Sequence, residues 1–106
     1  MDDKAITGLE TLLAKGQDNA LLRLSLGNAY LQKQQVEIAL QHYAQAVKLD
    51  PHYSAAWKSY GKALAENQQI TEAIQAYTTG INIAEQKGDR QAMKEMQVFL
   101  KRLQKL

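Results

Sequence analysis

Residues 54–87 read SAAWKSYGKALAENQQITEAIQAYTTGINIAEQK, and the stretch of equal length before them repeats the same landmarks. That earlier stretch, residues 20–53, reads ALLRLSLGNAYLQKQQVEIALQHYAQAVKLDPHY. Identities at this fixed spacing include Gly27 and Gly61, Ala29 and Ala63, Ala39 and Ala73, and Tyr43 and Tyr77. Such a period, about 34 residues, is typical of stacked pairs of helices, which build an extended concave binding surface. The repeat therefore predicts a binding scaffold but does not name what is bound.

Both units have the composition of paired helices. Small residues stand where two helices must approach closely, and aromatic residues stand where the remaining gap must be filled. Apolar residues recur at helical spacing, there is almost no β-branched alternation, and the single proline, Pro51, lies between two long helical stretches, near the end of the first unit. Asp50 precedes this proline and is expected to end a helix, because proline disfavours the helical conformation of the residue before it. We predict an all-α chain.

The second unit resembles the tetratricopeptide repeat (TPR), whose pattern runs from Trp through Leu-Gly, Tyr, Ala and an aromatic to a final Pro. Its matching residues are Trp57, Tyr60, Gly61, Leu64, Ala73, Tyr77 and Gly80. Further stretches, Gly27–Tyr30, Ser54–Lys58 and Lys94–Leu103, look like those of small stand-alone bacterial TPR proteins. The resemblance implies a right-handed α-solenoid of about six helices.

The resemblance extends by one helix in each direction. Ala5, Leu9 and Leu12 stand one period before Ala39, Tyr43 and Ala46, so residues 2–15 are expected to form the second helix of a truncated leading repeat, ended by Gly16. At the other end, residues 89–105 are expected to form an amphipathic capping helix that covers the second repeat. We thus predict one domain over residues 1–106, with complete repeats at 20–53 and 54–87.

Three departures from the pattern carry structural expectations. Arg23 stands where a large aromatic residue is usual, and Glu85 stands where the first unit has Pro51, so the fifth helix should run on to about Gln86 before Gly88. The turns at 33–35 and 67–69 lack the usual glycine, and any residue there with positive φ is strained by about 1 kcal/mol. Gly61 is expected to lie at a helix contact that leucine would overpack and alanine would disturb far less.

Composition narrows the function. The chain of 106 residues has no cysteine and a net charge of +2, which excludes disulfides and thiolate chemistry and gives no general reason to expect a polyanion partner. The acidic start of the sequence does not resemble a secretory signal, and no apolar run reaches the roughly 18 residues that would span a bilayer. We expect a cytoplasmic protein.

Catalysis finds little support in the sequence. His42 and His52 are ten residues apart and have no nearby cysteine or paired acidic ligands, so no metal site is expected. The glycines are scattered rather than gathered in a phosphate-binding loop. We predict a non-enzymatic protein without a cofactor.

The first helix of each unit lines the groove in TPR proteins, and the resemblance places seven candidate partner-binding residues there. They are Leu21, Leu24, Asn28, Leu31, Lys58, Lys62 and Glu66. Gln32, Ala55 and Ala65 are expected beside them. Among them Leu21 and Leu24 must be covered, either by the N-terminal helix or by a partner.

Lys58 and Lys62 are four residues apart on one predicted helix face, where like charges repel unless an anion lies between them. Alternatively, Lys62 pairs loosely with Glu66 in a solvated row. In chaperone-binding TPR domains, lysine and asparagine at such positions clamp a peptide's terminal carboxylate. Asn28 matches that asparagine, but Leu24 replaces the expected lysine, so the full clamp is absent.

Three functions follow, and the sequence leaves all of them open. The leading one is recognition of a peptide or protein segment in the concave groove. The first alternative is a self-associating assembly module, because the start of the chain is acidic and its end is basic. The second is a weak nucleic-acid binder that uses Lys101, Arg102 and Lys105, although no aromatic residue is expected on that face to stack on bases.

Overall fold

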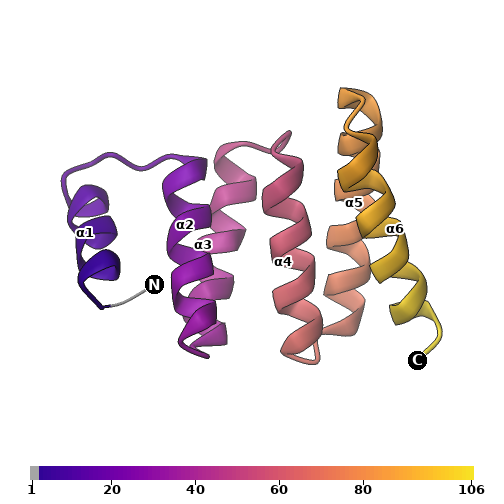
Figure 1. Ribbon diagram of the computed structural model, residues 1–106, viewed down its shortest axis with the longest axis horizontal. Coiled ribbons are helices and arrows are strands. Elements are labelled where there is room, and N and C mark those ends of the chain that lie inside the picture. The colour runs from indigo at the N-terminus through magenta and orange to yellow at the C-terminus, as the bar shows by residue number, and fades with distance from the viewer. Residues whose placement is uncertain (1–2) are drawn as a thin grey trace.

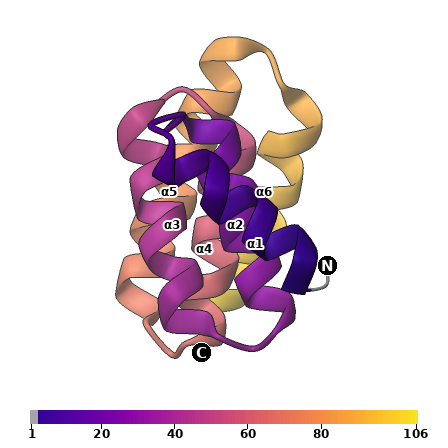
Figure 2. The same ribbon diagram turned by 90° about the vertical axis from the view of Figure 1, so that its left-hand side faces the viewer.

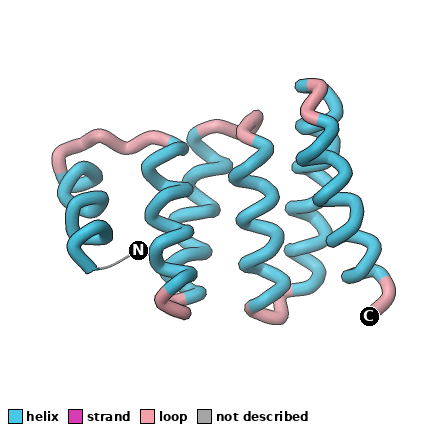
Figure 3. The backbone as a smooth tube through the Cα atoms, in the orientation of Figure 1, coloured by secondary structure: helices cyan, strands magenta, loops and turns pink. Residues whose placement is uncertain are grey.

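The computed structural model describes residues 3–106 and shows helices stacked side by side along the long axis of the molecule (Figure 1). Within this range there are six helices and no strand, and short loops join them (Figure 3). The helices are α1 (Asp3–Ala14), α2 (Ala20–Gln32), α3 (Val36–Leu49), α4 (Ser54–Glu66), α5 (Ile70–Lys87) and α6 (Arg90–Gln104). The principal extents are 40 × 28 × 19 Å. The chain is an all-α solenoid.

The helices form two layers. In the front layer α4 contacts α2 on one side and α6 on the other, while α3 and α5 lie behind them (Figure 1). Each complete repeat is a hairpin, α2 with α3 and α4 with α5. Seen from its N-terminal end, the stack begins with α1, which is inclined to the helices behind it (Figure 2). The expectation that the leading helix begins at residue 2 falls outside the described residues.

The turns inside the two hairpins carry the predicted strain. Gln34 and Gln68 have φ values of 62° and 65°, the left-handed conformation that favours glycine. Two backbone hydrogen bonds hold the first turn, from the Gln35 N–H to the Tyr30 carbonyl at 3.0 Å and from the Gln34 N–H to the Leu31 carbonyl at 2.9 Å. These bonds satisfy carbonyl groups that the end of α2 would leave unpaired.

The fifth helix is the longest, as the missing proline predicts. It runs one residue past the expected end and stops at Gly88, whose φ of 73° closes it. The next helix starts at once, because the Asp89 carboxylate accepts the Ala92 N–H at 3.2 Å. α6 then lies against α5, with Met96 fully buried.

The close approach of each helix pair depends on a glycine under a tyrosine ring. Tyr43 is fully buried and Tyr77 is 2% exposed. A Cβ atom built on Gly27 would lie 2.5 Å from Cε1 of Tyr43, and one built on Gly61 would lie 2.8 Å from Cε1 of Tyr77. Alanine at Gly61 is therefore also expected to disturb this contact, although less than leucine, because a single methyl group already overlaps a ring that the core holds in place.

We predict that Gly61→Ala lowers the free energy of unfolding by about 1–3 kcal/mol through overpacking. Gly8→Ala is the matched control, since a Cβ at Gly8 has nothing within 4 Å and alanine favours a helix by about 0.5–1 kcal/mol. Urea unfolding of both variants measures the difference. Equal stability of Gly61→Ala and the wild type would show that the ring moves aside freely.

A network of polar side chains attaches α1 to the first repeat. The Tyr30 hydroxyl donates to Glu10 of α1 at 2.9 Å, and His42 Nε2 lies 3.8 Å from the same carboxylate oxygen. Arg23 binds Asp18 through two hydrogen bonds of 2.7 and 3.0 Å, and its guanidinium lies 3.1 Å from His42 Nδ1. Arg23 stands where an aromatic residue is usual in the repeat, and its side chain joins Asp18 to His42 in this network.

Protonation of His42 should loosen that network. Burial lowers the pKa of His42 and the Arg23 charge lowers it further, while Glu10 and Asp18 oppose the shift. A neutral Nδ1 accepts a hydrogen bond from the guanidinium, whereas a protonated ring cannot.

We therefore predict that the protein loses stability as the pH falls from 7.5 to 5.5. The folded pKa lies below the unfolded value of about 6.5, so the unfolded state binds more protons in this window and the stability drops by at most about 1.4 kcal/mol per pH unit. Urea unfolding at both pH values, with His42→Gln as the control, measures the effect. A wild type and a control with the same pH dependence would exclude His42 as its source.

Candidate functional site

The exposed face of the front layer contains two adjoining hollows. The first, the α2–α4 hollow, has a volume of about 430 Å³ and is lined by Asn28, Leu31, Gln32, Lys62 and Glu66. The second, the α4–α6 slot, is smaller, at about 160 Å³. Its lining residues are Lys62, Ala65, Glu66, Tyr77, Phe99, Arg102 and Leu103. Because Lys62 and Glu66 line both, the hollows adjoin across the three front-layer helices, with Tyr77 of α5 reaching the slot from behind.

Four of the seven predicted groove residues come together in the α2–α4 hollow. Asn28 and Leu31 lie on α2, and Lys62 and Glu66 lie on α4. The side-chain oxygen of Asn28 accepts a hydrogen bond from the Tyr43 hydroxyl at 2.6 Å. The buried tyrosine of the first repeat therefore orients the amide that faces the hollow.

Leu24 differs from its predicted position. Its side chain is 8% exposed and belongs to the core cluster with Tyr43 and Ala56, so it offers little surface to a partner. The cover comes from the chain itself, because the alanines at the start of α4 are small enough to let that helix pack closely against α2.

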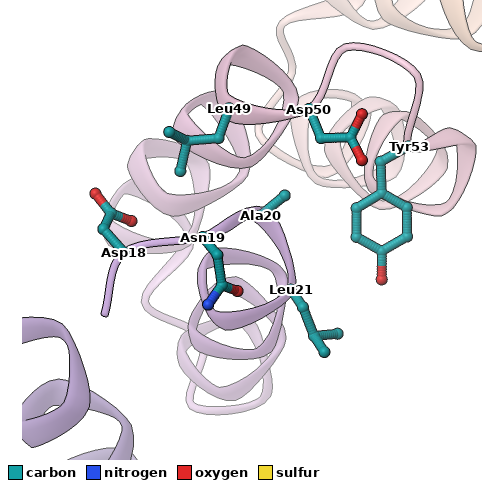
Figure 4. A pocket seen from close by; sticks show the side chains of 7 residues that line it. All are labelled: Asp18, Asn19, Ala20, Leu21, Leu49, Asp50 and Tyr53. Carbon is teal, nitrogen blue, oxygen red and sulfur yellow. The ribbon is translucent and has the colours of Figure 1, made fainter. Parts of the chain in front are cut away.

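Leu21 is 63% exposed and lies away from the other predicted residues. It borders a separate, open hollow at the start of α2, together with Asp18, Asn19, Ala20, Leu49, Asp50 and Tyr53. Figure 4 shows these side chains spread around the helix start rather than converging on one point. The Asp18 carboxylate is held by Arg23, and Asp50 accepts the His52 N–H at 3.1 Å. This hollow is a poor candidate for a binding site.

Lys58 is engaged by the chain's own last helix. Its ammonium lies 2.9 Å from Oε2 of Glu95, and this hydrogen bond and the charge behind it lower the pKa of Glu95. The sequence predicted that an anion would offset the repulsion between Lys58 and Lys62. At Lys58 this anion is the carboxylate of Glu95 on α6. Within the described residues Lys62 forms no ion pair, so the predicted pairing with Glu66 is not made.

The contribution of α6 to this surface was not predicted from the sequence. Phe99 stacks on Tyr77 with ring centroids 5.8 Å apart, and the Arg102 guanidinium lies 5.9 Å from the Phe99 centroid. α6 occupies the place of the next front-layer helix, but it begins slightly later than the repeat period requires, so a search at that fixed period fails to align it.

The same arrangement bears on the nucleic-acid alternative. Lys101 on α6 and Lys105 just after its end are exposed, but Phe99 is packed against Tyr77 and is not free to stack on a base. Residues 3–106 contain no cluster of three or more histidines or acidic residues that could hold a metal ion. In the same range, no helix is long and apolar enough to cross a membrane.

Stacked pairs of helices in two layers, with hollows along the exposed face of the front layer, define a helical-repeat protein of the α-solenoid class. The sequence profile of the tetratricopeptide repeat matches residues 24–86, and the chain belongs to this family. The TPR repeat-containing protein PA0015 of Pseudomonas aeruginosa is 49% identical over 98 residues, which are 92% of this chain and 93% of that protein.

Two solved structures extend the comparison. Protein BPP2914 from Bordetella parapertussis is 44% identical, with a TM-score of 0.81 over 94% of this chain and 87% of that one. The second TPR domain of human RPAP3, in complex with the HSP70 peptide SGPTIEEVD, is 29% identical, with a TM-score of 0.71 over 88% of this chain and 78% of that one. The relatives confirm the predicted resemblance to small bacterial TPR proteins.

We predict that Lys58→Glu lowers the urea midpoint of unfolding more than Lys62→Glu does. The first substitution places a carboxylate against Glu95, whereas the second changes a lysine without an ion-pair partner in the described structure. Adding Glu95→Lys to Lys58→Glu should restore the midpoint by reversing the pair. Identical midpoints for the two single variants would show that the α4–α6 ion pair does not contribute.

Proposed function

We propose that this protein binds a linear peptide segment of a partner protein along the α2–α4 hollow and the α4–α6 slot. TPR domains are in general protein–protein interaction modules, and the family assignment carries that general role to this chain. The observation that supports the site is the meeting of both hollows at Lys62 and Glu66, because it makes one path across the three front-layer helices. An extended segment fits such a path better than a compact ligand does.

The chemistry of the path suits recognition rather than reaction. It offers an ammonium, a guanidinium, two amides and a carboxylate beside apolar side chains, and neither histidine lines either hollow. RPAP3 shares this fold and holds a peptide with three acidic residues near its end. The positive charges of Lys62 and Arg102 would likewise attract an acidic peptide to this chain. The absence of cysteine agrees with a protein that functions in a reducing compartment such as the cytoplasm.

Selection from a random dodecapeptide display library tests the proposal. Selected peptides are synthesised, and fluorescence anisotropy measures their affinity for the wild type and for two charge reversals. We expect Lys62→Glu to weaken binding at least tenfold and Lys4→Glu to change it less than twofold, because Lys4 is an exposed lysine on α1, outside both hollows.

Two results would refute the proposal. One is a selection that yields no binding peptide. The other is binding that responds equally to both reversals, since it would show a general effect of net charge rather than recognition at Lys62.

A further inference from the structure

The outward side of α6 carries a row of exposed cations. This row, the α6 stripe, consists of Arg90, Lys94, Lys101 and Lys105, the last just beyond the end of the helix. Their spacing along the chain keeps them within about 60° of the helix circumference and spreads them over about 22 Å of its length. The stripe lies opposite to Ala92 and Met96, the buried residues of this helix.

The nearby acidic residues leave the stripe positive. Asp89 is turned toward α4, where its carboxylate accepts from the Ser54 hydroxyl at 3.2 Å. Glu95 is turned toward the same helix and pairs with Lys58. Glu85 of α5 lines a hollow together with the first two members of the stripe. Within residues 3–106, however, no member of the stripe forms an ion pair.

The stripe also faces away from the rest of the described chain. α6 closes the C-terminal end of the stack and contacts only α4 and α5 among the described helices (Figure 1). No member of the stripe lines the α2–α4 hollow or the α4–α6 slot. A ligand of the stripe would therefore be separate from the peptide of the proposed function.

A second copy stacked end to end does not complement the stripe. At the α1 end, Asp3 pairs with Lys33, and Glu10 accepts a hydrogen bond from α2. Lys4 and Lys15 are exposed there and form no ion pair within the described residues. End-to-end contact would thus bring cations against cations, which repel each other.

A membrane or an acidic protein would need apolar surface beside the charges. Amphipathic helices bind a bilayer by inserting their apolar side, but that side of α6 is packed on α5, with Met96 fully buried. The core of a protein interface is depleted of charged residues. Among the members of the stripe the exposed apolar side chain is that of Val98, which is 48% exposed. A nucleic-acid backbone needs only the row of cations.

We infer that the α6 stripe binds the phosphate backbone of double-stranded DNA, with α6 lying along the major groove. Duplex DNA carries one negative charge for about every 1.7 Å of its axis. Its major groove, about 12 Å wide, admits an α-helix, whereas the major groove of an RNA duplex is narrow and deep. Single strands are bound by stacking on aromatic side chains, but Phe99 is packed on Tyr77. Because phosphate contacts carry no sequence information, the binding does not depend on base sequence.

Salt dependence tests the inference with the full chain. Fluorescence anisotropy of a short fluorescein-labelled duplex of mixed sequence measures the association constant at several NaCl concentrations. Each phosphate contact contributes about −0.9 to the slope of log K against log salt, so four cations give a slope of about −3.6. We expect Lys94→Gln/Lys101→Gln to reduce the slope to about −1.8 and to weaken binding at least tenfold at about 0.1 M salt.

Lys4→Gln/Lys15→Gln is the matched control, because it removes the same charge from exposed lysines at the α1 end. The two ends are separated along the 40 Å axis of the molecule (Figure 1), whereas the Debye length is about 10 Å at 0.1 M salt. We expect the control to change the affinity less than twofold and to keep the slope of the wild type. Circular dichroism reports whether both variants fold.

Several results would overturn the inference. Equal effects of the two double variants would show a response to net charge, and a slope near zero would exclude phosphate contacts. A single strand or an RNA duplex that binds as tightly as the DNA duplex would exclude the major groove. Capture by phosphatidylserine vesicles at a salt concentration that releases the DNA would assign the stripe to a membrane surface. None of these results bears on the hollows, which the display selection tests separately.

Discussion

The contact between a glycine on the front helix and a tyrosine ring on the back helix is the constraint on which each repeat depends. Gly27 under Tyr43 and Gly61 under Tyr77 let the paired helices approach until a Cβ atom would overlap the ring. The ring fills the space between the helices, and its hydroxyl reaches toward the exposed face, as the bond from Tyr43 to Asn28 shows. In the first repeat one contact therefore sets both the packing of the hairpin and the orientation of the Asn28 amide on its exposed face.

The two ends of the stack are held in different ways. At the N-terminal end, Glu10 and Arg23 with their partners form a polar network, so the attachment of α1 depends on protonation states. At the other end, Met96 is buried against Gly80, and Phe99 stacks on Tyr77. Apolar burial at this end is insensitive to pH, and it makes α6 an integral part of the second repeat.

The capping helix thereby acquires a second role. The residues that cover the second repeat also present Arg102 and Leu103 to the slot, and Glu95 engages Lys58. Stability and the proposed recognition involve the same helix because a front-layer helix has one side against the helix behind it and another on the exposed face. A truncation that removed α6 would therefore disturb both properties together, whereas substitutions at single positions separate them.

The sequence by itself determined the repeat, the helix pairs and the strained turns, because these depend on local chemistry: helical spacing of apolar residues, glycine at close contacts and the lack of glycine at Gln34 and Gln68. It also indicated Asn28, Leu31, Lys62 and Glu66, which share one face of the first helix in each unit. Only the tertiary structure decided that Leu24 is covered by α4, that Lys58 is neutralised by Glu95 and that α6 completes the slot. These outcomes depend on how closely a helix packs against residues that are distant from it in the sequence. In addition, the longer α5 makes α6 begin slightly later than a fixed repeat period would place it.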